Sequence, residues 1–504
     1  MTQPQPVPLA MLTAGMLTAP ADVVVTDVTL DSRAVTPGAL FLACRGARHH
    51  GIEFAREAVA RGASALLFET PDDAAPAAIA ADASVFVAGV PALGQYVGTI
   101  ASRFFGAPSQ ALMVVGITGT NGKTTCAYMV AQALTLCGRT AAYIGTIGAG
   151  LPPALESSTH TTADAVSVQR QLATLKALGA ECVAMEVSSH ALDQGRVDAV
   201  RFRIAAFTNL THDHLDYHGS MGAYGAAKAR LLGRAGLDAR IVNVDDEFGR
   251  ELARRTDGGA GGLIVTSRQS PDVKAFSGVS HVRARGVERL PGGLRIDVES
   301  SWGEIRIATP LLGDFNVDNV LTVLAALLAA DIPLGKAADA IAACTAPPGR
   351  MEVLQGDGAA AVAIVDYAHT PDALAKALGA ARMHCPGILR VVFGCGGDRD
   401  AAKRPLMGRI AFELADEVVL TDDNPRSEDP ESIVGEILGG IATPEAVRIV
   451  HDRAAAIRGA LDRSRAGDVV LIAGKGHEDY QNHGTQRRAF SDQAVARDYF
   501  AGHA

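Results

Sequence analysis

The stretch Val114–Thr125 (VVGITGTNGKTT) restricts the possible folds of this chain more than any other segment does. An apolar run at 111–115 leads into it and is typical of a buried strand, whereas residues 126–136 (CAYMVAQALTL) have the composition of a helix. A glycine-rich turn between a strand and a helix lets backbone N–H groups surround phosphate, and the helix N-terminus favours negative charge. The stretch therefore predicts a nucleotide-binding α/β domain.

The spacing within this loop departs from the usual phosphate-loop pattern. Ile117 stands where that pattern has its first glycine, and Gly116 comes one position too early. We expect Lys123 to reach the terminal phosphates and Thr124 to hold Mg²⁺. The alternative is an ordinary strand–turn–helix corner. The strand, the Gly-Lys-Thr and the helix follow one another in the order that a phosphate loop requires, which disfavours this alternative. The predicted ATP contacts of this loop are Gly119, Thr120, Asn121, Gly122, Lys123, Thr124 and Thr125.

Composition excludes several classes of protein. The chain has 504 residues, enough for about three domains. A formal charge of −9 argues against general binding to nucleic acid or to anionic membranes. Seven cysteines without a Cys-x-x-Cys pair are typical of a reduced, cytoplasmic protein. No basic residue precedes the mildly apolar N-terminus, and long apolar runs are missing, so we expect neither a secretory signal nor a membrane span.

Short apolar runs alternate with helical stretches along most of the chain, which predicts an α/β protein with a mostly parallel, doubly wound central sheet. Residues 270–310 look like antiparallel strands that precede a helix at 317–330. Pro347-Pro348-Gly349 is a predicted linker. The predicted domains are a small α/β domain at 1–95, a central P-loop domain at 96–346 and a Rossmann-like α/β domain at 347–504.

Polar clusters follow three of the predicted strands in the last third of the chain. They are Gly396–Arg399, Asp423–Arg426 and Gly474–Glu478. Because the carboxyl ends of parallel strands lie along one edge of a sheet, we expect these clusters to gather where ligands bind. Scattered solvent-exposed loops would give the same order by chance. The apolar runs in this region are 362–366, 389–394, 417–421, 447–450 and 469–473.

Two polar groups follow strands of the central domain. Glu186 ends the apolar run 182–185, and an acid in that place commonly lies near the metal of a P-loop protein. A structural carboxylate is the alternative. The segment 208–218 (TNLTHDHLDYH) invites a zinc interpretation, but the phosphate loop already requires Mg²⁺. We therefore favour His214 near Mg²⁺.

Lys228 lies in the helical stretch 224–232 (YGAAKARLL). A solvated helix lysine is the ordinary interpretation. The alternative is a buried, neutral lysine that takes up CO₂ and becomes a carbamate, which turns a cation into a metal-ligating anion. Burial that lowers the pKa of the amine is the condition for it.

Taken together, these segments resemble the Mur ligase family of peptidoglycan synthesis, whose phosphate loop has the same early glycine. Within that family the chain is most similar to ligases that add meso-diaminopimelate to UDP-N-acetylmuramoyl-L-alanyl-D-glutamate. The segments that carry the resemblance are 116–125 (GITGTNGKTT), 185–190 (MEVSSH), 208–219 (TNLTHDHLDYHG), 224–228 (YGAAK), 394–404 (GCGGDRDAAKR), 423–426 (DNPR) and 474–478 (GKGHE).

The resemblance implies an ATP-dependent acid–amino-acid ligase with an acyl-phosphate intermediate. It implies ATP, two Mg²⁺ ions and a carbamate (carboxylysine) at Lys228, which reverses the ordinary interpretation of that lysine. It also implies that the three domains bind the UDP-linked substrate, ATP and the amino acid, respectively. We expect a cytoplasmic monomer that acts on small molecules and binds no nucleic acid.

The resemblance also assigns roles to individual residues. The implied catalytic residues are Lys123, Glu186, His214 and Lys228, and the implied metal ligands are Thr124, Glu186, His214 and carbamylated Lys228. The implied UDP-substrate contacts are Leu30, Ser32, Ala47, Arg48, His49, Thr161, Thr162, Ser188, Gln194 and Arg196. Further ATP contacts are Asn316, Asn319, Arg350 and Asp366, and the diaminopimelate contacts are Arg399, Asp423, Asn424, Pro425, Arg426, Gly474 and Glu478.

We expect the DNPR segment, residues 423–426, to determine which amino acid the ligase accepts. Diaminopimelate differs from lysine by a second carboxylate beside its far amino group. The planar guanidinium of Arg426 matches such a carboxylate bidentately, Arg399 can add a contact, and Glu478 can take the ammonium. Alone, Asn-Pro would indicate only a turn with a solvated arginine.

Three other functions stay open. One is a lysine-adding relative, and a second is a folylpolyglutamate synthase-like ligase, which would require neither the N-terminal TLDSR segment nor the DNPR cluster. The third, from another class, is a P-loop NTPase switch that hydrolyses ATP without small substrates.

Overall fold

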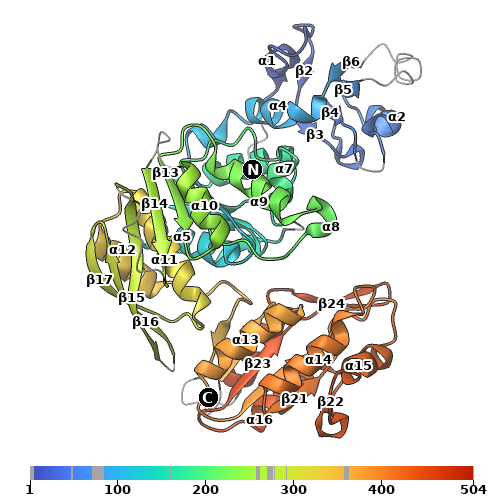
Figure 1. The fold of residues 1–504 in the computed structure, drawn as a ribbon. Helices are drawn as coiled ribbons and strands as arrows, with labels where there is room; N and C mark the ends of the chain where they lie inside the picture. Colours follow the sequence, from blue (N-terminus) through green and yellow to red (C-terminus); the bar gives the residue numbers. More distant parts are fainter. Residues whose placement is uncertain are drawn as a thin grey trace. The chain divides into compact units, whose positions relative to one another are not determined.

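The structure is a computed structural model in which the chain forms two compact units, residues 1–264 and 265–504 (Figure 1). The described residues are 5–46, 49–70, 85–158, 160–256, 262–269, 276, 278–290, 292–356 and 362–502. Among these residues, no helix is both long and apolar enough to cross a membrane.

Unit 1 begins with a parallel four-stranded sheet in the order β3-β4-β5-β6. Successive side chains of β4 point to opposite faces, so Leu42 joins the core formed with α1 and α4 while Phe41 joins the core formed with α2. The elements are β1 (Val7–Pro8), α1 (Leu9–Leu12), β2 (Val24–Val25), β3 (Asp27–Thr29), β4 (Ala39–Ala43), α2 (Ala55–Ala60), β5 (Ala65–Thr70), β6 (Phe86–Pro91) and α4 (Val97–Phe104).

A larger sheet follows, with the order β10-β9-β8-β11-β7-β12-β13 within unit 1. Its strands β8, β11, β7, β12 and β13 are parallel, and β9 and β10 are antiparallel. All residues of β8, β11, β12 and β13 are buried, as expected for a parallel sheet covered on both faces. The strands are β7 (Met113–Thr118), β8 (Ala141–Gly145), β9 (Gly148–Leu151), β10 (Ala154–Glu156), β11 (Cys182–Glu186), β12 (Ile204–Phe207) and β13 (Ala239–Asn243).

Helices connect these strands. The helix predicted at 126–136 begins earlier, at Lys123, directly after Gly122 in the left-handed conformation. Asp164 begins α6 by accepting the N–H groups of Val166 and Ser167, which explains that boundary. The helices are α5 (Lys123–Leu136), α6 (Ala165–Ala177), α7 (Ser189–Asp193), α8 (Leu215–His218), α9 (Met221–Leu232) and α10 (Glu247–Thr256).

The strand before the phosphate loop lies in the middle of the sheet. β7 pairs with β11 on one side and β12 on the other, both in parallel. The ends of the three strands, at Thr118, Glu186 and Phe207, therefore lie side by side at one edge. The predicted α/β class and the mostly parallel, doubly wound central sheet are confirmed.

Unit 2 begins with the antiparallel strands β15, β16 and β17, which confirms the prediction for the described part of 270–310. The helix predicted at 317–330 is α11, whose residues are almost all buried. The elements are β15 (Ser280–Leu290), β16 (Gly293–Ser300), β17 (Gly303–Thr309), α11 (Phe315–Ala329) and α12 (Leu334–Ala343), while β14 (Gly262–Ser267) crosses the boundary between the units.

The last sheet has the order β18-β19-β23-β20-β21-β22, with only β18 antiparallel to its neighbour. Strands β19 and β23 coincide with the predicted runs 362–366 and 469–473. The strands are β18 (Glu352–Leu354), β19 (Val362–Asp366), β20 (Leu389–Phe393), β21 (Glu417–Leu420), β22 (Arg448–Ile449) and β23 (Val469–Ala473), and a separate hairpin contains β24 (Tyr480–His483) and β25 (Gln486–Ala489).

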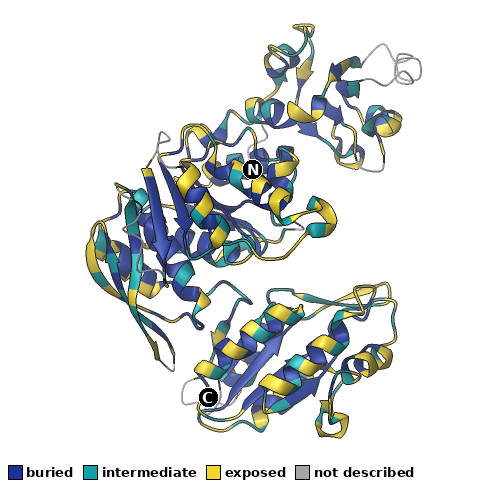
Figure 2. Cartoon of the chain, viewed as in Figure 1, coloured by how far each residue is buried: buried dark blue, intermediate teal, exposed yellow. Residues whose placement is uncertain are grey.

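Helices cover both faces of this sheet, and Figure 2 shows its strands buried beneath helices with exposed outer sides. Leu471 packs in the core formed with α13, α14 and α15, whereas its neighbour Ile472 packs in the core formed with α16 and α17. The alternation follows from the two-residue period of a strand. The helices are α13 (Pro371–Met383), α14 (Lys403–Leu414), α15 (Pro430–Leu438), α16 (Arg453–Asp462) and α17 (Asp492–Ala501).

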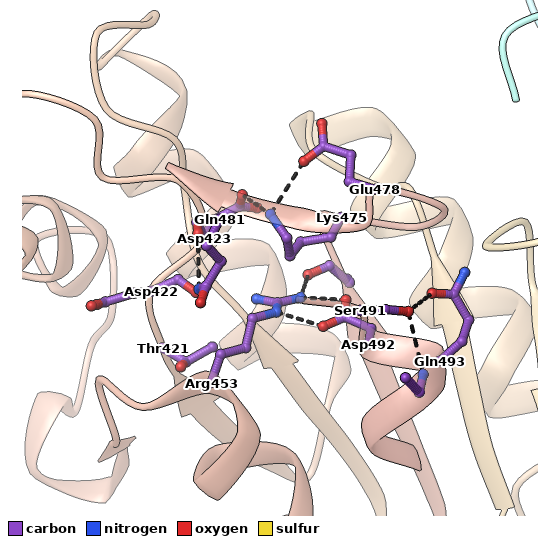
Figure 3. A network of polar contacts seen from close by, with 12 residues as sticks. Thr421, Asp422, Asp423, Arg453, Lys475, Glu478, Gln481, Ser491, Asp492 and Gln493 are labelled. Atoms are coloured by element: carbon purple, nitrogen blue, oxygen red, sulfur yellow. Dashed lines mark hydrogen bonds and ion pairs between the residues drawn. The ribbon is translucent and has the colours of Figure 1, made fainter. Parts of the chain in front are cut away.

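A buried ion pair joins the starts of α16 and α17. Arg453 donates through Nε and Nη2 to the two carboxylate oxygens of Asp492 at 2.7 and 2.8 Å, and neither side chain is exposed (Figure 3). Arg453 also donates to the carbonyl of Ala473 at the end of β23. The pair therefore connects two helices to the edge of the sheet.

We expect Asp492→Ala to lower the free energy of unfolding by about 3–5 kcal/mol, because it leaves a guanidinium buried without its carboxylate. Urea denaturation followed by circular dichroism measures the loss. As a matched control, Arg306→Ala removes an exposed arginine that pairs with Asp297 and should leave the midpoint almost unchanged. Equal midpoints for the two variants would contradict a structural role for the buried pair.

Candidate active site

The phosphate loop has a conformation that only glycine adopts easily. Gly119 has φ of 149°, and a Cβ at this position would collide with the hydroxyl of Thr208. No side chain among the described residues caps the start of α5. Its first N–H groups can therefore bind an anion.

The segment after β12 supports this loop from the other side. Thr120 donates its N–H to the carbonyl of Asn209 at 2.8 Å, and Asn121 donates to the side-chain oxygen of Asn209 at 2.9 Å. The N–H of Thr211 donates to the hydroxyl of Thr120 at 3.0 Å. Thr125 is half-buried in the first turn of α5. The loop is thus held in shape without a ligand.

Two lysines contact the carbonyl of Gly119. Nζ of Lys123 lies 3.0 Å from this oxygen and 2.9 Å from the carbonyl of Thr120. Nζ of Lys228, which is only 1% exposed, lies 2.7 Å from the Gly119 oxygen and 4.3 Å from the centroid of the Tyr224 ring. Burial, and secondarily the charge of Lys123, lowers the pKa of Lys228 to about 6. The solvated interpretation of Lys228 is therefore wrong.

Glu186 is fully buried at the end of β11 and accepts several hydrogen bonds. The hydroxyl of Thr124 donates to its Oε2 at 3.0 Å, the N–H of Thr146 donates to Oε1 at 2.9 Å, and the hydroxyl of Tyr143 donates to Oε1. A hydroxyl beside a carboxylate is a set of hard oxygen donors that suits Mg²⁺. The sequence did not identify Tyr143 and Thr146 as partners of Glu186.

The structure gives no support to the zinc interpretation of the histidines in 208–218. Across the described residues, no group of three or more His, Cys, Asp or Glu side chains is placed to hold a metal ion. His214 is exposed, and its ring lies 4.9 Å from that of His190 and 6.1 Å from that of Tyr224. Burial, followed by the charges of His214 and His218, lowers the pKa of His190. Tyr224 also contacts Thr120 through its hydroxyl at 3.2 Å, so it connects His214, Lys228 and the phosphate loop.

A cavity of about 470 Å³ in unit 1 brings several predicted UDP-substrate residues together. Leu30, Gln194 and Arg196 line it, together with Cys44. Arg196 donates from Nε to the side-chain oxygen of Gln194 and from Nη1 to the carbonyl of Thr162, both at 2.9 Å. The guanidinium is therefore held in a fixed direction.

The buried hydroxyl of Thr162 connects this cavity to the acid on β11. It donates to the backbone carbonyl of Glu186 at 2.9 Å and accepts the N–H of Ser188 at 3.1 Å. Thr161 accepts from the hydroxyl of Thr146 at 3.1 Å. The residues predicted for the UDP-linked substrate therefore extend to the surroundings of Glu186.

Two other predicted UDP-substrate residues, Ser32 and His49, are not among the described residues that line the cavity. Ser32 is buried and donates to Glu57 at 2.7 Å, and His49 lies 3.2 Å from Glu53. Ala47 and Arg48 lie outside the described residues.

The remaining predicted ATP contacts belong to unit 2. Asn316 and Asn319 are buried on the first turns of α11, where Asn319 donates to the side-chain oxygen of Asn316 at 2.7 Å. Arg350 lies over the ring of Tyr367, 4.8 Å from its centroid. Asp366 accepts the N–H of Met351 at 2.8 Å, and burial raises the pKa of its carboxyl.

The three polar clusters of the C-terminal sheet meet at one edge, as predicted. A Cβ on Gly474, whose φ is 118°, would lie 2.6 Å from Oδ2 of Asp423. Beside them lies Lys475, which is fully buried and which the sequence placed in this cluster without a role of its own. Its Nζ is 3.5 Å from Asp423, 3.2 Å from the side-chain oxygen of Asn424 and 3.2 Å from Glu478 (Figure 3).

Arg426 occupies the end of this edge in a strained conformation. Its φ of 52° places a non-glycine residue in the left-handed region, and the residue is half-buried. Nη1 donates to the carbonyl of Gly397 at 2.6 Å. Asn424 donates to Glu478 at 3.0 Å, whereas Pro425 is buried and Arg399 is exposed. The edge thus presents a guanidinium and a carboxylate that hydrogen bonds hold in position.

Three protein-family models match the chain, and their domains follow one another in the sequence. They are the Mur ligase family, catalytic domain, at residues 24–104, the Mur ligase middle domain at 117–327, and the Mur ligase, glutamate ligase domain, at 349–476.

Similar proteins span nearly the whole chain. A UDP-N-acetylmuramoyl-L-alanyl-D-glutamate–2,6-diaminopimelate ligase of Xanthomonas campestris pv. campestris is 49% identical over 94% of each chain. A ligase of the same name from Pseudomonas aeruginosa is 46% identical over 94% of each chain. A solved structure of a protein with this name is 33% identical, with a TM-score of 0.71 over 99% of this chain and 100% of that one.

More distant structures share the fold alone. A folylpolyglutamate synthase from Mycobacterium tuberculosis is 18% identical, with a TM-score of 0.58 over 75% of this chain and 91% of that one. The matches to three family models and to relatives well above 30% identity carry the assignment: this chain belongs to the Mur ligase family.

Proposed function

We propose that this chain is an ATP-dependent ligase that joins meso-2,6-diaminopimelate to UDP-N-acetylmuramoyl-L-alanyl-D-glutamate. The 49% identity to a ligase of that name, spread over 94% of both chains, carries the proposal. The phosphate loop, the cavity lined by Arg196 and the edge that holds Arg426 and Glu478 support it, because the reaction needs a nucleotide, a large anionic substrate and an amino acid.

We further propose the division of labour among domains that the sequence predicts. Residues 1–95 bind the uridine nucleotide, 96–346 bind ATP and 347–504 bind the amino acid. The three family models, at 24–104, 117–327 and 349–476, support these boundaries. The chain works on small molecules of the cytoplasm, and we propose that it does so as a monomer.

The proposed reaction proceeds in two steps. The side-chain carboxylate of the D-glutamyl residue attacks the γ-phosphorus of ATP, which gives an acyl phosphate and ADP. The amine then attacks the acyl carbon, phosphate leaves, and the nitrogen loses a proton. The first step brings a carboxylate onto a polyphosphate, so positive charge must offset their repulsion. Lys123 and the first N–H groups of α5 supply it.

The oxygen donors near the loop suit Mg²⁺ ions. Thr124, Glu186 and His214, with Lys228 as a carbamate, would hold two of them. Bound Mg²⁺ would supply further positive charge to the phosphates. The hydroxyl of Thr124 lies directly on the carboxylate of Glu186, and the fixed hydrogen bonds from β8 and its following turn orient that carboxylate.

Lys228 meets the conditions for carbamate formation. A neutral amine adds to CO₂ and releases one proton, and burial keeps the amine of Lys228 largely neutral at pH 7. The carbamate would place an anion beneath the phosphate loop, next to Tyr224 and Lys123. With the carbamate, the site would hold one amine and one anion in place of two amines, and the anion makes it suited to metal ions.

The edge of the C-terminal sheet supports the choice of diaminopimelate over lysine. We propose that Arg426, helped by Arg399, binds the distal carboxylate and that Glu478 binds the distal ammonium, within a pocket completed by Asp423, Asn424, Pro425 and Gly474. Lysine would leave the guanidinium without its carboxylate, which costs about 3 kcal/mol. The corresponding discrimination is on the order of a hundredfold.

Phosphate release tests the proposed function against its alternatives. Purified chain with ATP and Mg²⁺ should release phosphate only when the UDP-linked dipeptide and meso-diaminopimelate are both present. L-Lysine in place of diaminopimelate should be used about a hundredfold less efficiently. Equal use of lysine would indicate the lysine-adding activity. Turnover with a folate and glutamate, or with ATP alone, would overturn the proposal in favour of a folylpolyglutamate synthase or an NTPase switch.

We expect Arg426→Ala to raise the KM for meso-diaminopimelate about a hundredfold, because the distal carboxylate loses its bidentate partner. The KM for ATP should stay within about twofold of the wild-type value. Arg488→Ala, which removes an exposed arginine of β25, is the matched control and should behave like the wild type. Unchanged kinetics for Arg426→Ala would place the selectivity elsewhere.

The pH dependence of stability tests whether Lys228 is neutral. In the folded chain its pKa is about 6, whereas in the unfolded chain it returns to the ordinary lysine pKa of 10.5. Between these values only the unfolded chain holds the proton, so this lysine makes the free energy of unfolding rise with pH, by about 1.4 kcal/mol per unit.

Lys228→Met removes this contribution. Its stability advantage over the wild type should therefore shrink by about 1.4 kcal/mol per unit from about pH 7 to pH 9, measured by urea denaturation in CO₂-free buffer. Lys376→Met, at an exposed lysine of α13, should show no such trend. A difference between Lys228→Met and wild type that stays constant with pH would mean that Lys228 is charged when folded.

A further inference from the structure

We propose that Gln481 is a positioning residue for amino-acid selectivity: from β24, its side-chain amide fixes the loop that carries Arg426. The inference rests on the proposed function, since it concerns the same amino-acid site. Gln481 was not among the residues that the sequence singled out, and it does not need to touch a substrate to act.

The loop Asp422–Arg426 has little regular structure of its own. β21 ends at Leu420, and the next residues belong to neither a helix nor a strand of the sheet. The carbonyls of Asp422 and Asp423 both accept from Nε2 of Gln481, at 3.2 and 3.1 Å. Figure 3 shows this amide directed at the loop from the β24 side. One side chain therefore holds the first two peptide groups of the loop.

The next residue of β24 holds the rest of the loop. The N–H of Asn482 donates to the side-chain oxygen of Asn424 at 2.9 Å. The carbonyl of Asn482 accepts the N–H of Arg426 at 3.0 Å. Contacts from two adjacent residues of β24 thus reach the beginning, the middle and the end of the loop.

The conformation of Arg426 requires such support. A non-glycine residue at φ of 52° is strained and persists where its surroundings enforce that conformation. The turn after β24 contributes, because the N–H of Gly484 donates to the carbonyl of Arg426 at 2.6 Å. Releasing the start of the loop lets this backbone relax and turns the guanidinium away from its fixed direction.

The consequence differs between the two candidate amino acids. The distal end of diaminopimelate carries a carboxylate and an ammonium, so it needs Arg426 and Glu478 at a fixed separation. Glu478 keeps its contact to Lys475 at 3.2 Å, which does not involve the loop. Loss of the Gln481 amide therefore weakens binding of the distal carboxylate more than binding of the distal ammonium. Because lysine has only the ammonium at that end, its binding is affected less than that of diaminopimelate.

Two substitutions test the amide directly. Gln481→Leu removes both hydrogen bonds, and Gln481→Glu keeps the shape but has no N–H to donate. Gln486→Leu is the matched control, because Gln486 lies on the same hairpin and is exposed, and its side-chain oxygen accepts from the exposed Arg488. It makes the same chemical change away from the loop.

We expect both Gln481 variants to raise the KM for meso-diaminopimelate about tenfold and to lower the preference for it over lysine by a similar factor. Their kcat and their KM for ATP should stay within about twofold of wild type, as should every constant of Gln486→Leu. A merely structural role would instead lower kcat with both amino acids and raise the KM for ATP. That result, or an unchanged KM for diaminopimelate, would overturn the inference.

Hydrogen exchange separates this inference from the proposed function, because it needs no substrate. The N–H of Arg426 should exchange faster in both Gln481 variants than in wild type and in Gln486→Leu. If the wild type does not use diaminopimelate, the proposed function fails and the selectivity role with it, while faster exchange would still show that Gln481 holds the loop. Unchanged exchange would refute the positioning itself.

Discussion

The carbonyl of Gly119 is the point on which the central site depends. Two lysine amines, from Lys123 and Lys228, donate to this one oxygen. Burial, and secondarily the charge of Lys123, lowers the pKa of Lys228, so the two amines need not both be charged. The backbone that presents this oxygen requires glycine, because a Cβ at position 119 would collide with the hydroxyl of Thr208. The conformation of the phosphate loop therefore determines both where the two lysine amines lie and how they are charged.

The sequence predicted the framework because parallel strands that are buried on both faces appear as continuous apolar runs. β19 and β23 lie where such runs were found, and glycine and polar residues directly after strands predicted which edge carries the sites. The burial of Lys228 was different. An alanine-rich helix gives little indication of which face is covered, so the pattern alone favoured a solvated lysine, and only the resemblance to a family favoured the buried one.

Partners of functional side chains were the least predictable part. Tyr143 orients Glu186 from the neighbouring strand, Lys475 joins Asp423 to the GKGHE segment, and Gln481 reaches the loop from a separate hairpin. The two members of each pair are far apart in the sequence, and the arrangement of the strands brings them together. Apolar periodicity records which residues face a core, but it holds no information on which polar groups meet across a sheet.

The most direct test of carboxyl activation follows one oxygen atom. In the proposed reaction, the phosphate that leaves the acyl phosphate keeps an oxygen of the substrate carboxylate. A UDP-linked dipeptide labelled with oxygen-18 in the D-glutamyl side-chain carboxylate should give inorganic phosphate that carries one labelled atom per amide bond formed, measured by mass spectrometry. Release of unlabelled phosphate together with amide product would contradict activation of that carboxyl group by ATP.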